Sequence, residues 1–305
     1  MEGYLRTLAE FEQRFATEGA CRAYLARLRW PTGFRCPQCT TNGSWTTTRS
    51  LLMCRQCGYQ ASVTAGTIFH RTRIPLQDWF RALWWMTDHK NRLSASGLQR
   101  LLGLGSYRTA WLWLQKLQRA MVRPGMDQLE GRVEVDETYI DGVESKGSSP
   151  HLENKALVAI AAQVDRKGIG RIRLRRIPAA SVSPLIAFVK HAVEAGSVVI
   201  TDGWEAYAGL RQEGFKHRPR AINTSNMTAS DMLPRVQKVA SLLKRWLLRT
   251  HQGPLSCEQL DSYLDEFTYL FNRRTSKYRG RLFHRLVAQV IAVEPSPFSR
   301  LATDS

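Results

Sequence analysis

Four cysteines near the start of the sequence have the spacing of a metal site. Cys36 and Cys39 form one C-x-x-C pair, and Cys54 and Cys57 form a second pair after 14 intervening residues. Each pair can lie on a tight turn, so that four thiolates converge on one zinc ion in tetrahedral geometry. Buried free thiols or a redox pair are the alternative, which two matched pairs disfavour. Since four thiolates leave no open position for water, we expect the zinc to be structural.

Two aspartates in the second half of the chain are placed by predicted strands. Asp136 follows the alternating strand of VEVDETYIDG, and Asp202 closes the buried strand of VVITDGWEAY. Acids at the ends of adjacent strands can face each other and bind divalent cations. Two magnesium ions about 3.5–4 Å apart would stabilise the attacking and leaving oxygens of a phosphodiester displacement. Each motif alone is weak, but the pair predicts a catalytic metal site. We expect Glu137 to point to the opposite face of its strand from Asp136.

The charge of the chain favours nucleic acid as its partner. The 305 residues include 44 Lys and Arg against 26 Asp and Glu, a net charge of +18. A protein this basic most often binds a polyanion. Hydrophobic residues make up 43% of the chain, which excludes global disorder. No apolar run approaches the roughly 18–20 residues that span a membrane, and the N-terminus has no signal-peptide core. These features predict a cytoplasmic protein without a membrane partner.

The first 124 residues are expected to form small elements rather than one large domain. The pattern predicts N-terminal helices over 1–30, a zinc ribbon over 31–70 and a helical region over 71–124. In the helical region, two helical runs flank the turn GLGS with the spacing of a helix-turn-helix. Arg108 lies at the start of the second run, where a recognition helix contacts base edges. A plain helical hairpin that packs Trp111 and Trp113 is the alternative.

The remainder of the chain changes to strands. Three strand-like runs, RVEVDETYI, KALVAIAAQV and GRIRLRRI, are followed by alternating helices and strands. DRKG joins the second and third runs and is typical of a hairpin. This order predicts an α/β fold in which helices flank a mixed sheet.

These motifs together resemble the zinc-ribbon DDE transposases of bacterial insertion sequences, over nearly all of residues 10–295. Besides the two C-x-x-C pairs, the resemblance rests on TAGTIFH, LLGLGSYRTAW, VEVDETYIDG, VVITDGWEAY, SLLKRWLLRTHQG and YLDEFTYLFNRR. It implies an RNase H-like catalytic domain over 130–295, Mg²⁺ or Mn²⁺ as the catalytic metal, and structural zinc. It also implies DNA as the partner, both the terminal repeats of the element and the target, and a homodimer or larger assembly on that DNA. Such a protein would associate with the bacterial nucleoid when bound.

The resemblance also assigns roles to particular residues. Asp136 and Asp202 match the first and second metal-binding acids of the family, and Lys244 matches its basic residue near the cleaved phosphate. The third catalytic position falls at 237, seven residues before Lys244, so that both side chains share a helix face. This chain has Gln237 where the family has Glu, Asn or His. A Gln carbonyl can bind magnesium, but without charge it would hold the ion more weakly. Other acids that could take the third catalytic position are Asp231, Glu258, Asp265 and Glu266.

Several groups of basic residues are expected to contact DNA, although a solvated face would explain each of them alone. The predicted contacts are Arg171, Arg173 and Arg175 on one strand; Lys238, Arg245 and Arg249 on the helix of Lys244; and Arg273 and Arg274 at a turn.

The sequence thus predicts a transposase that cleaves the ends of its element and joins them to new DNA. A catalytically impaired, DNA-binding copy disabled by Gln237 is the main alternative. A nuclease that hydrolyses DNA without joining it is a third.

Overall fold

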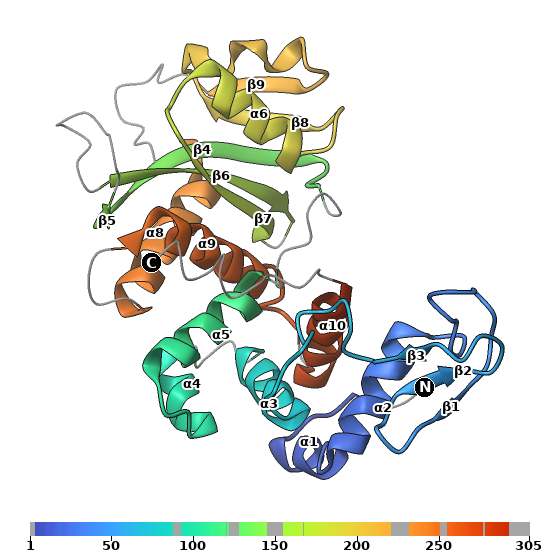
Figure 1. Cartoon of the computed structure of the whole chain (residues 1–305). Coiled ribbons are helices and arrows are strands. Elements are labelled where there is room, and N and C mark those ends of the chain that lie inside the picture. The colour runs from blue at the N-terminus through green and yellow to red at the C-terminus, as the bar shows by residue number, and fades with distance from the viewer. Residues whose placement is uncertain are drawn as a thin grey trace. The chain divides into compact units, whose positions relative to one another are not determined.

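The computed structural model describes residues 4–87, 93–119, 121, 128–144, 155–166, 168–220, 232–250, 255–276 and 278–292. The chain folds as two compact units. One consists of Met1–Met121 together with Thr275–Ser305, and the other of Val122–Arg274. Figure 1 labels their helices and strands.

The first unit joins a small three-stranded ribbon to a set of helices. The ribbon has the strands β1 (Ser44–Thr46), β2 (Leu52–Cys54) and β3 (Gln60–Ala61) in antiparallel order. The helices are α1 (Leu8–Arg14), α2 (Glu18–Arg29), α3 (Leu76–Met86), α4 (Ala95–Leu102), α5 (Tyr107–Arg119) and α10 (Arg279–Ala292). Thr7 and Thr17 cap the first two helices, because their side chains accept hydrogen bonds from the backbone N–H groups of Glu10 and Ala20.

Aromatic side chains build the helical core of this unit. Phe11 of α1 stacks on Trp84 of α3 with ring centroids 4.8 Å apart, and it packs edge-on against Phe283 of α10. Phe15 and Phe80 make a further edge contact at 4.9 Å. Because these rings come from three distant parts of the sequence, burial of aromatic surface is what joins the helices.

The last helix, α10, belongs to the first unit. Gly280 donates its backbone N–H to the carbonyl of Leu5, and any side chain at this position would collide with the Leu5 backbone. Arg279 donates to the carbonyl of Trp84 near the end of α3. The domain expected over 130–295 therefore differs from the compact unit, which ends at Arg274.

Two helices occupy the segment with helix-turn-helix spacing. Helix α4 begins at the cap Ser94 and ends at Gly103, whose φ of 62° is the left-handed conformation that glycine adopts easily. Helix α5 follows after a short turn, with Tyr107 and Arg108 exposed at its start. No helix among the described residues is long and apolar enough to cross a membrane.

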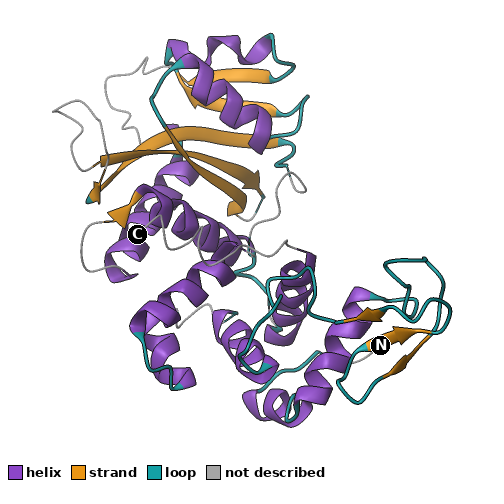
Figure 2. Cartoon of the chain, in the orientation of Figure 1, coloured by secondary structure: helices purple, strands orange, loops and turns teal. Residues whose placement is uncertain are grey.

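A five-stranded mixed sheet forms the second unit (Figure 2). Its strands lie in the order β7 (Gly168–Ile177), β6 (Lys155–Asp165), β4 (Arg132–Asp141), β8 (Val198–Asp202) and β9 (Lys216–Arg220). The first three strands are antiparallel, whereas β8 and β9 run parallel to β4. A separate short sheet pairs β5 (Val143–Glu144) with β10 (Leu255–Ser256). This order and these directions confirm the predicted RNase H-like mixed sheet and its β6–β7 hairpin.

Helices cover both faces of this sheet, which gives it two cores (Figure 1). One face carries α6 (Val182–Ala192) and the 3-10 helix η2 (Glu205–Arg211). The other face carries α8 (Pro234–Thr250) and α9 (Cys257–Asn272). Along β4, Val133 and Val135 point into the core of the α6 face, and Ile140 points into the core of the α8 face. Odd and even positions of β4 thus face different helices.

Candidate active site and metal centre

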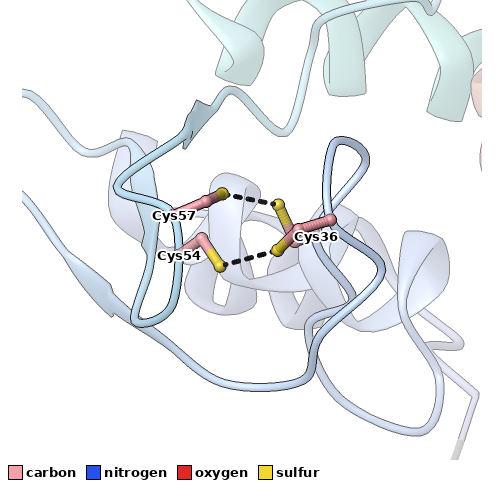
Figure 3. Close-up of side chains that lie close together, drawn as sticks. Cys36, Cys54 and Cys57 are labelled. Atoms are coloured by element: carbon pink, nitrogen blue, oxygen red, sulfur yellow. Dashed lines mark hydrogen bonds between the residues drawn. The ribbon is translucent and has the colours of Figure 1, made fainter.

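The four predicted cysteines converge in the ribbon. Their sulfur atoms all lie within 4.8 Å of one another, and Figure 3 shows side chains from two separate loops pointing to one centre. The Sγ atoms of Cys36 and Cys57 are 3.6 Å apart, and those of Cys39 and Cys54 are 3.5 Å apart. Sulfur atoms this close fit the tetrahedral corners of one zinc ion.

The two C-x-x-C turns have the same backbone form. The residue after each pair adopts a left-handed conformation, with φ of 58° at Thr40 and 70° at Gly58. In each turn this residue donates its N–H to the carbonyl of the first cysteine of its pair, Cys36 or Cys54. The glycine suits this geometry, whereas a β-branched threonine adopts it at a cost.

The two aspartates lie on neighbouring parallel strands, on one face of the sheet. Strand β4 pairs with β8 in the register Glu134↔Ile200, so two residues further on Asp136 comes beside Asp202. Both occupy even positions and therefore face α8. Backbone donors orient the two carboxylates: Glu137 N–H to Asp136 Oδ1 at 2.9 Å, and Trp204 N–H to Asp202 Oδ1 at 3.2 Å.

Gln237 lies at this pair, where the counting placed the third catalytic position. It is in the first turn of α8, and its Nε2 donates to Asp136 Oδ2 over 2.8 Å. Among the described residues, no third carboxylate or imidazole gathers with Asp136 and Asp202. Of the alternatives, Asp265 and Glu266 lie on α9. Asp231 and the side chain of Glu258 fall outside the described residues.

A buried carboxylate that the sequence reasoning missed holds this helix in place. Glu134 is completely buried, and its side chain accepts from the Arg235 guanidinium at 2.9 Å and from the backbone N–H groups of Arg235 and Val236 at 2.8 and 3.3 Å. It thereby satisfies free donors in the first turn of α8. Because Glu134 and Asp136 share a face of β4, one strand segment fixes both the aspartate and the helix of Gln237. Nothing in the sequence distinguished Glu134, because it occupies one of the alternating polar positions of its strand.

Burial raises the pKa of Asp136. Desolvation raises the pKa of Asp136 from 3.8 to about 6, and the charge of Asp202 adds to the increase. Hydrogen bonds from the Glu137 N–H and from Gln237 favour the ionised form and act in the opposite direction. The carboxylate is therefore poised to lose its proton near neutral pH, as a metal ligand must.

Glu137 points to the opposite face of the sheet, as predicted. Its Oε2 accepts from the hydroxyl of Tyr207 at 2.6 Å, and Tyr207 belongs to the core beneath α6. Burial raises the pKa of both the Glu137 carboxyl and the Tyr207 hydroxyl. The tyrosine stays protonated and donates to the carboxylate.

His217 is buried beside the end of β8. Its Nε2 lies 2.9 Å from Thr201 Oγ1, and that hydroxyl donates to the backbone carbonyl of Asp202. Burial lowers the pKa of His217. The imidazole thus supports the strand end that carries Asp202, because β9 places it beside β8 on the face away from the aspartate.

The basic residues predicted to contact DNA fall into two structural groups. On α8, Lys238, Lys244 and Arg245 are exposed, whereas the side chain of Arg249 lies outside the described residues. Arg108 is exposed at the start of α5. Their exposure is compatible with DNA contact, which stays a prediction for this group.

Most side chains of the other group donate hydrogen bonds to oxygen atoms within the fold. Arg171 donates to the carbonyl of Gln128 and to Gln163 Oε1, and Arg173 donates to the carbonyl of Ile172. Arg273 donates to Tyr269 and lies 3.8 Å from its ring. Arg274 donates to the carbonyls of Phe271, Gly170 and Ile169. Arg175 is exposed on the same strand face as Arg173. DNA contact by this second group stays a prediction, beside the structural role that these hydrogen bonds give it.

Comparison with known proteins finds transposase domains in both parts of the chain that contain a candidate site. Residues 128–272 match a family described as the ISXO2-like transposase domain, and residues 16–60 match a transposase zinc-ribbon domain. Together these matches span more than half of the chain. A relative from Halobacterium salinarum, described as an uncharacterized protein in transposable element ISH50, is 26% identical over 275 residues, which cover 83% of this chain and 90% of the relative. The chain is an insertion-sequence transposase with an N-terminal zinc ribbon and an ISXO2-like DDE domain.

Some solved transposase structures are also similar. The Mos1 strand transfer complex and the Mos1 paired-end complex with left transposon end are 13% and 15% identical, with TM-scores of 0.30 and 0.34. Each match covers 74% of this transposase and 77% or 78% of the Mos1 chain. These scores are too low to bear on the fold, which rests on the strand order of this transposase itself.

The two matched domains contain the residues of both candidate sites. The matched ribbon contains all four cysteines, so the transposase has the four-thiolate site of a structural zinc. The matched DDE-type domain contains Asp136, Asp202, Gln237 and Lys244.

Proposed function

We propose that this transposase cleaves the ends of its insertion sequence and transfers the freed strands to target DNA. The observation that carries the proposal is the meeting of Asp136, Asp202 and the first turn of α8 on one face of the sheet. Asp136 and Asp202 would hold the divalent metal, Mg²⁺ or Mn²⁺, which supplies electrostatic stabilisation to the attacking and leaving oxygens. The oxygen chemistry of these carboxylates suits either ion.

The residues of the chain contribute position and charge. Backbone N–H groups fix the Oδ1 atom of each carboxylate. Lys244, about two helical turns beyond Gln237 and exposed, would contact the DNA backbone near the cleaved phosphate. Water attacks first and frees a 3′-hydroxyl, and that hydroxyl then attacks the target strand in line. The zinc ribbon and the α4–α5 pair would bind the element ends, and cleavage of two ends in concert would take a homodimer or larger assembly.

The orientation of Gln237 favours a second candidate function, a DNA-binding protein with impaired catalysis. The Nε2 group, not the carbonyl oxygen, meets Asp136. An amide donor cannot bind a cation, and Gln237 must reorient its amide before its oxygen can serve. A weakly held second metal would slow cleavage and leave DNA binding intact.

A plasmid transposition assay with the flanking DNA of the gene separates these functions. Native protein, Asp136→Ala and Gln237→Glu are compared with Mg²⁺ and with Mn²⁺. Joined products from native protein that disappear in Asp136→Ala support the transposase. Products from Gln237→Glu alone support the impaired copy. Cleaved but never joined ends would identify a nuclease and overturn the proposal.

A further inference from the structure

A row of basic side chains lies along β9, the edge strand beside Asp202. The strand reads KHRPR, and its alternation separates the cations Lys216, Arg218 and Arg220 from His217 and Pro219. His217 bonds Thr201 on the α6 side of the sheet. The three cations therefore lie on the opposite side, the one that faces α8.

One end of this row lies beside Asp202 in the neighbouring strand. Strand β9 pairs with β8 in the register Val198↔Lys216, Ile200↔Arg218 and Asp202↔Arg220. Arg220 is thus the cross-strand neighbour of Asp202, on the same face. Its guanidinium donates to the carbonyl of Met232, two residues before α8 begins.

The outer two cations are available to a ligand. Lys216 and Arg218 are exposed, and neither makes a hydrogen bond or an ion pair within the part of the chain that the structure describes. Pro219 has no N–H, so it also prevents another strand from pairing there at the edge. The β9 edge can therefore bind an anionic partner through its exposed cations.

The opposite edge of the sheet gives a contrast within the same unit. Strand β7 also carries three alternating cations, Arg171, Arg173 and Arg175, but they lie on the α6 side because Arg173 pairs with Ala161 and Arg175 with Ala159. Arg171 and Arg173 are bonded to neighbouring oxygens. Of the two rows, only the one on β9 shares a face with Asp136 and Asp202.

We propose that Lys216, Arg218 and Arg220 form a phosphate-binding edge that holds the backbone of one DNA strand as it enters the active site. The inference rests on the proposed function and identifies a binding surface for its substrate. Alternate residues of a strand are roughly 6.6 Å apart, so the three cations follow a polyanion over roughly 13 Å. Such contacts fix the register of the DNA without reading its sequence.

The test measures the salt dependence of DNA binding. The variant Lys216→Gln/Arg218→Gln/Arg220→Gln is compared with native protein on a duplex oligonucleotide from the gene's flank. The matched control is Arg166→Gln/Lys190→Gln/Arg211→Gln, which removes three exposed cations of the same unit that lie outside the predicted DNA contacts. Each neutralised phosphate of a duplex contributes about 0.9 to the slope of log K against log salt, so the β9 variant should lower the slope by about 3. The double variant Lys216→Gln/Arg218→Gln, which leaves the Met232 contact intact, should lower it by about 2. Arg218→Lys keeps the charge and should bind as native protein does.

A second readout places the contact near the reaction. Single neutral methylphosphonates are introduced around the cleaved bond of the substrate. They should slow cleavage by native protein at two or three consecutive positions, and they should have no added effect at those positions on the double variant. A slope unchanged in both β9 variants, or lowered equally by the control variant, overturns the proposal. If native protein and Asp136→Ala are equally inactive while only the β9 variants lose slope, the proposed function fails and the DNA-binding edge stands.

Discussion

The zinc ribbon and the candidate acidic site are assembled in opposite ways. The four zinc ligands come from two short turns within one ribbon, and Thr40 and Gly58 give both turns the same backbone form. The acidic site instead joins two strands and a helix, and Asp136 and Gln237 lie 101 positions apart. The small ribbon needs zinc in order to fold. The acidic site, in contrast, can bind a metal only after the sheet and α8 have folded.

Removal of zinc should have the largest effect, confined to the ribbon. The apparent free energy of structural zinc binding is about 10–16 kcal/mol, more than so small a ribbon can replace by burial. Chelation, or Cys54→Ser, should therefore unfold the ribbon and leave the sheet of the second unit folded. Amide resonances of both units report this directly. Cys257→Ser, which alters a cysteine of α9 outside the cluster, is the control and should change neither unit; a ribbon that keeps its resonances without zinc would refute the comparison.

The acidic site should depend on its buried anchor. Glu134→Gln replaces a completely buried carboxylate by an amide and leaves Arg235, whose side chain is 29% exposed, without its charged partner. Loss of these charged hydrogen bonds should cost about 1.5–3 kcal/mol of unfolding free energy. The control is Glu130→Gln, because Glu130 is exposed and makes a long ion pair of 3.9 Å with Arg171. Its loss should lower the free energy of unfolding by less than about 1 kcal/mol. Urea unfolding of the two variants measures the difference. Equal midpoints would show that α8 is held by other contacts.

Metal binding to the acidic site should depend on pH. Since the pKa of Asp136 is raised to about 6, affinity for Mn²⁺ should fall about tenfold for each pH unit below that value. The metal-free protein should respond in the opposite sense, because the folded state retains this proton more strongly. The contribution of Asp136 to stability declines as the pH rises from about 4 to about 6. Calorimetric titration with Mn²⁺ over this range tests the slope, and Asp136→Asn should remove it.

The smallest effect should come from the two turns of the ribbon. Thr40→Gly relieves a left-handed threonine and should stabilise the zinc-loaded ribbon by about 1 kcal/mol. Gly58→Thr introduces the same strain and should destabilise it by a similar amount. Thermal melts of the zinc-loaded protein can resolve both changes. Shifts of the same sign would show that the turns are not equivalent.

The same contrast explains what the sequence could predict. The cysteine spacing alone specified the zinc site, because every ligand is fixed by its own turn. Asp136 and Asp202 were predictable as acids placed by strands. The expectation that Asp136 follows its strand was wrong, because β4 continues to Asp141 and Asp136 lies within it, whereas Asp202 does end β8. The alignment of the two acids was not predictable, since the register of β4 and β8 is set by packing across the whole sheet.

Residues that support the catalytic positions were the ones missed. Glu134 resembled one more acid of an alternating strand, and His217 a surface histidine. Only the folded sheet shows that the first binds α8 and the second supports the end of β8. The arginines of β7 formed the clearer basic row in the sequence, yet the sheet places them on the face away from the aspartates. A strand pattern separates the two faces but does not say which face carries the site.

The most direct test of the active site is a crystal of the transposase grown with Mn²⁺ and measured at the manganese absorption edge. An anomalous peak should lie between the carboxylates of Asp136 and Asp202, close to Gln237. The variant Asp202→Asn should lack that peak. An ion bound elsewhere, or none between these carboxylates at saturating Mn²⁺, would contradict the assignment of this site.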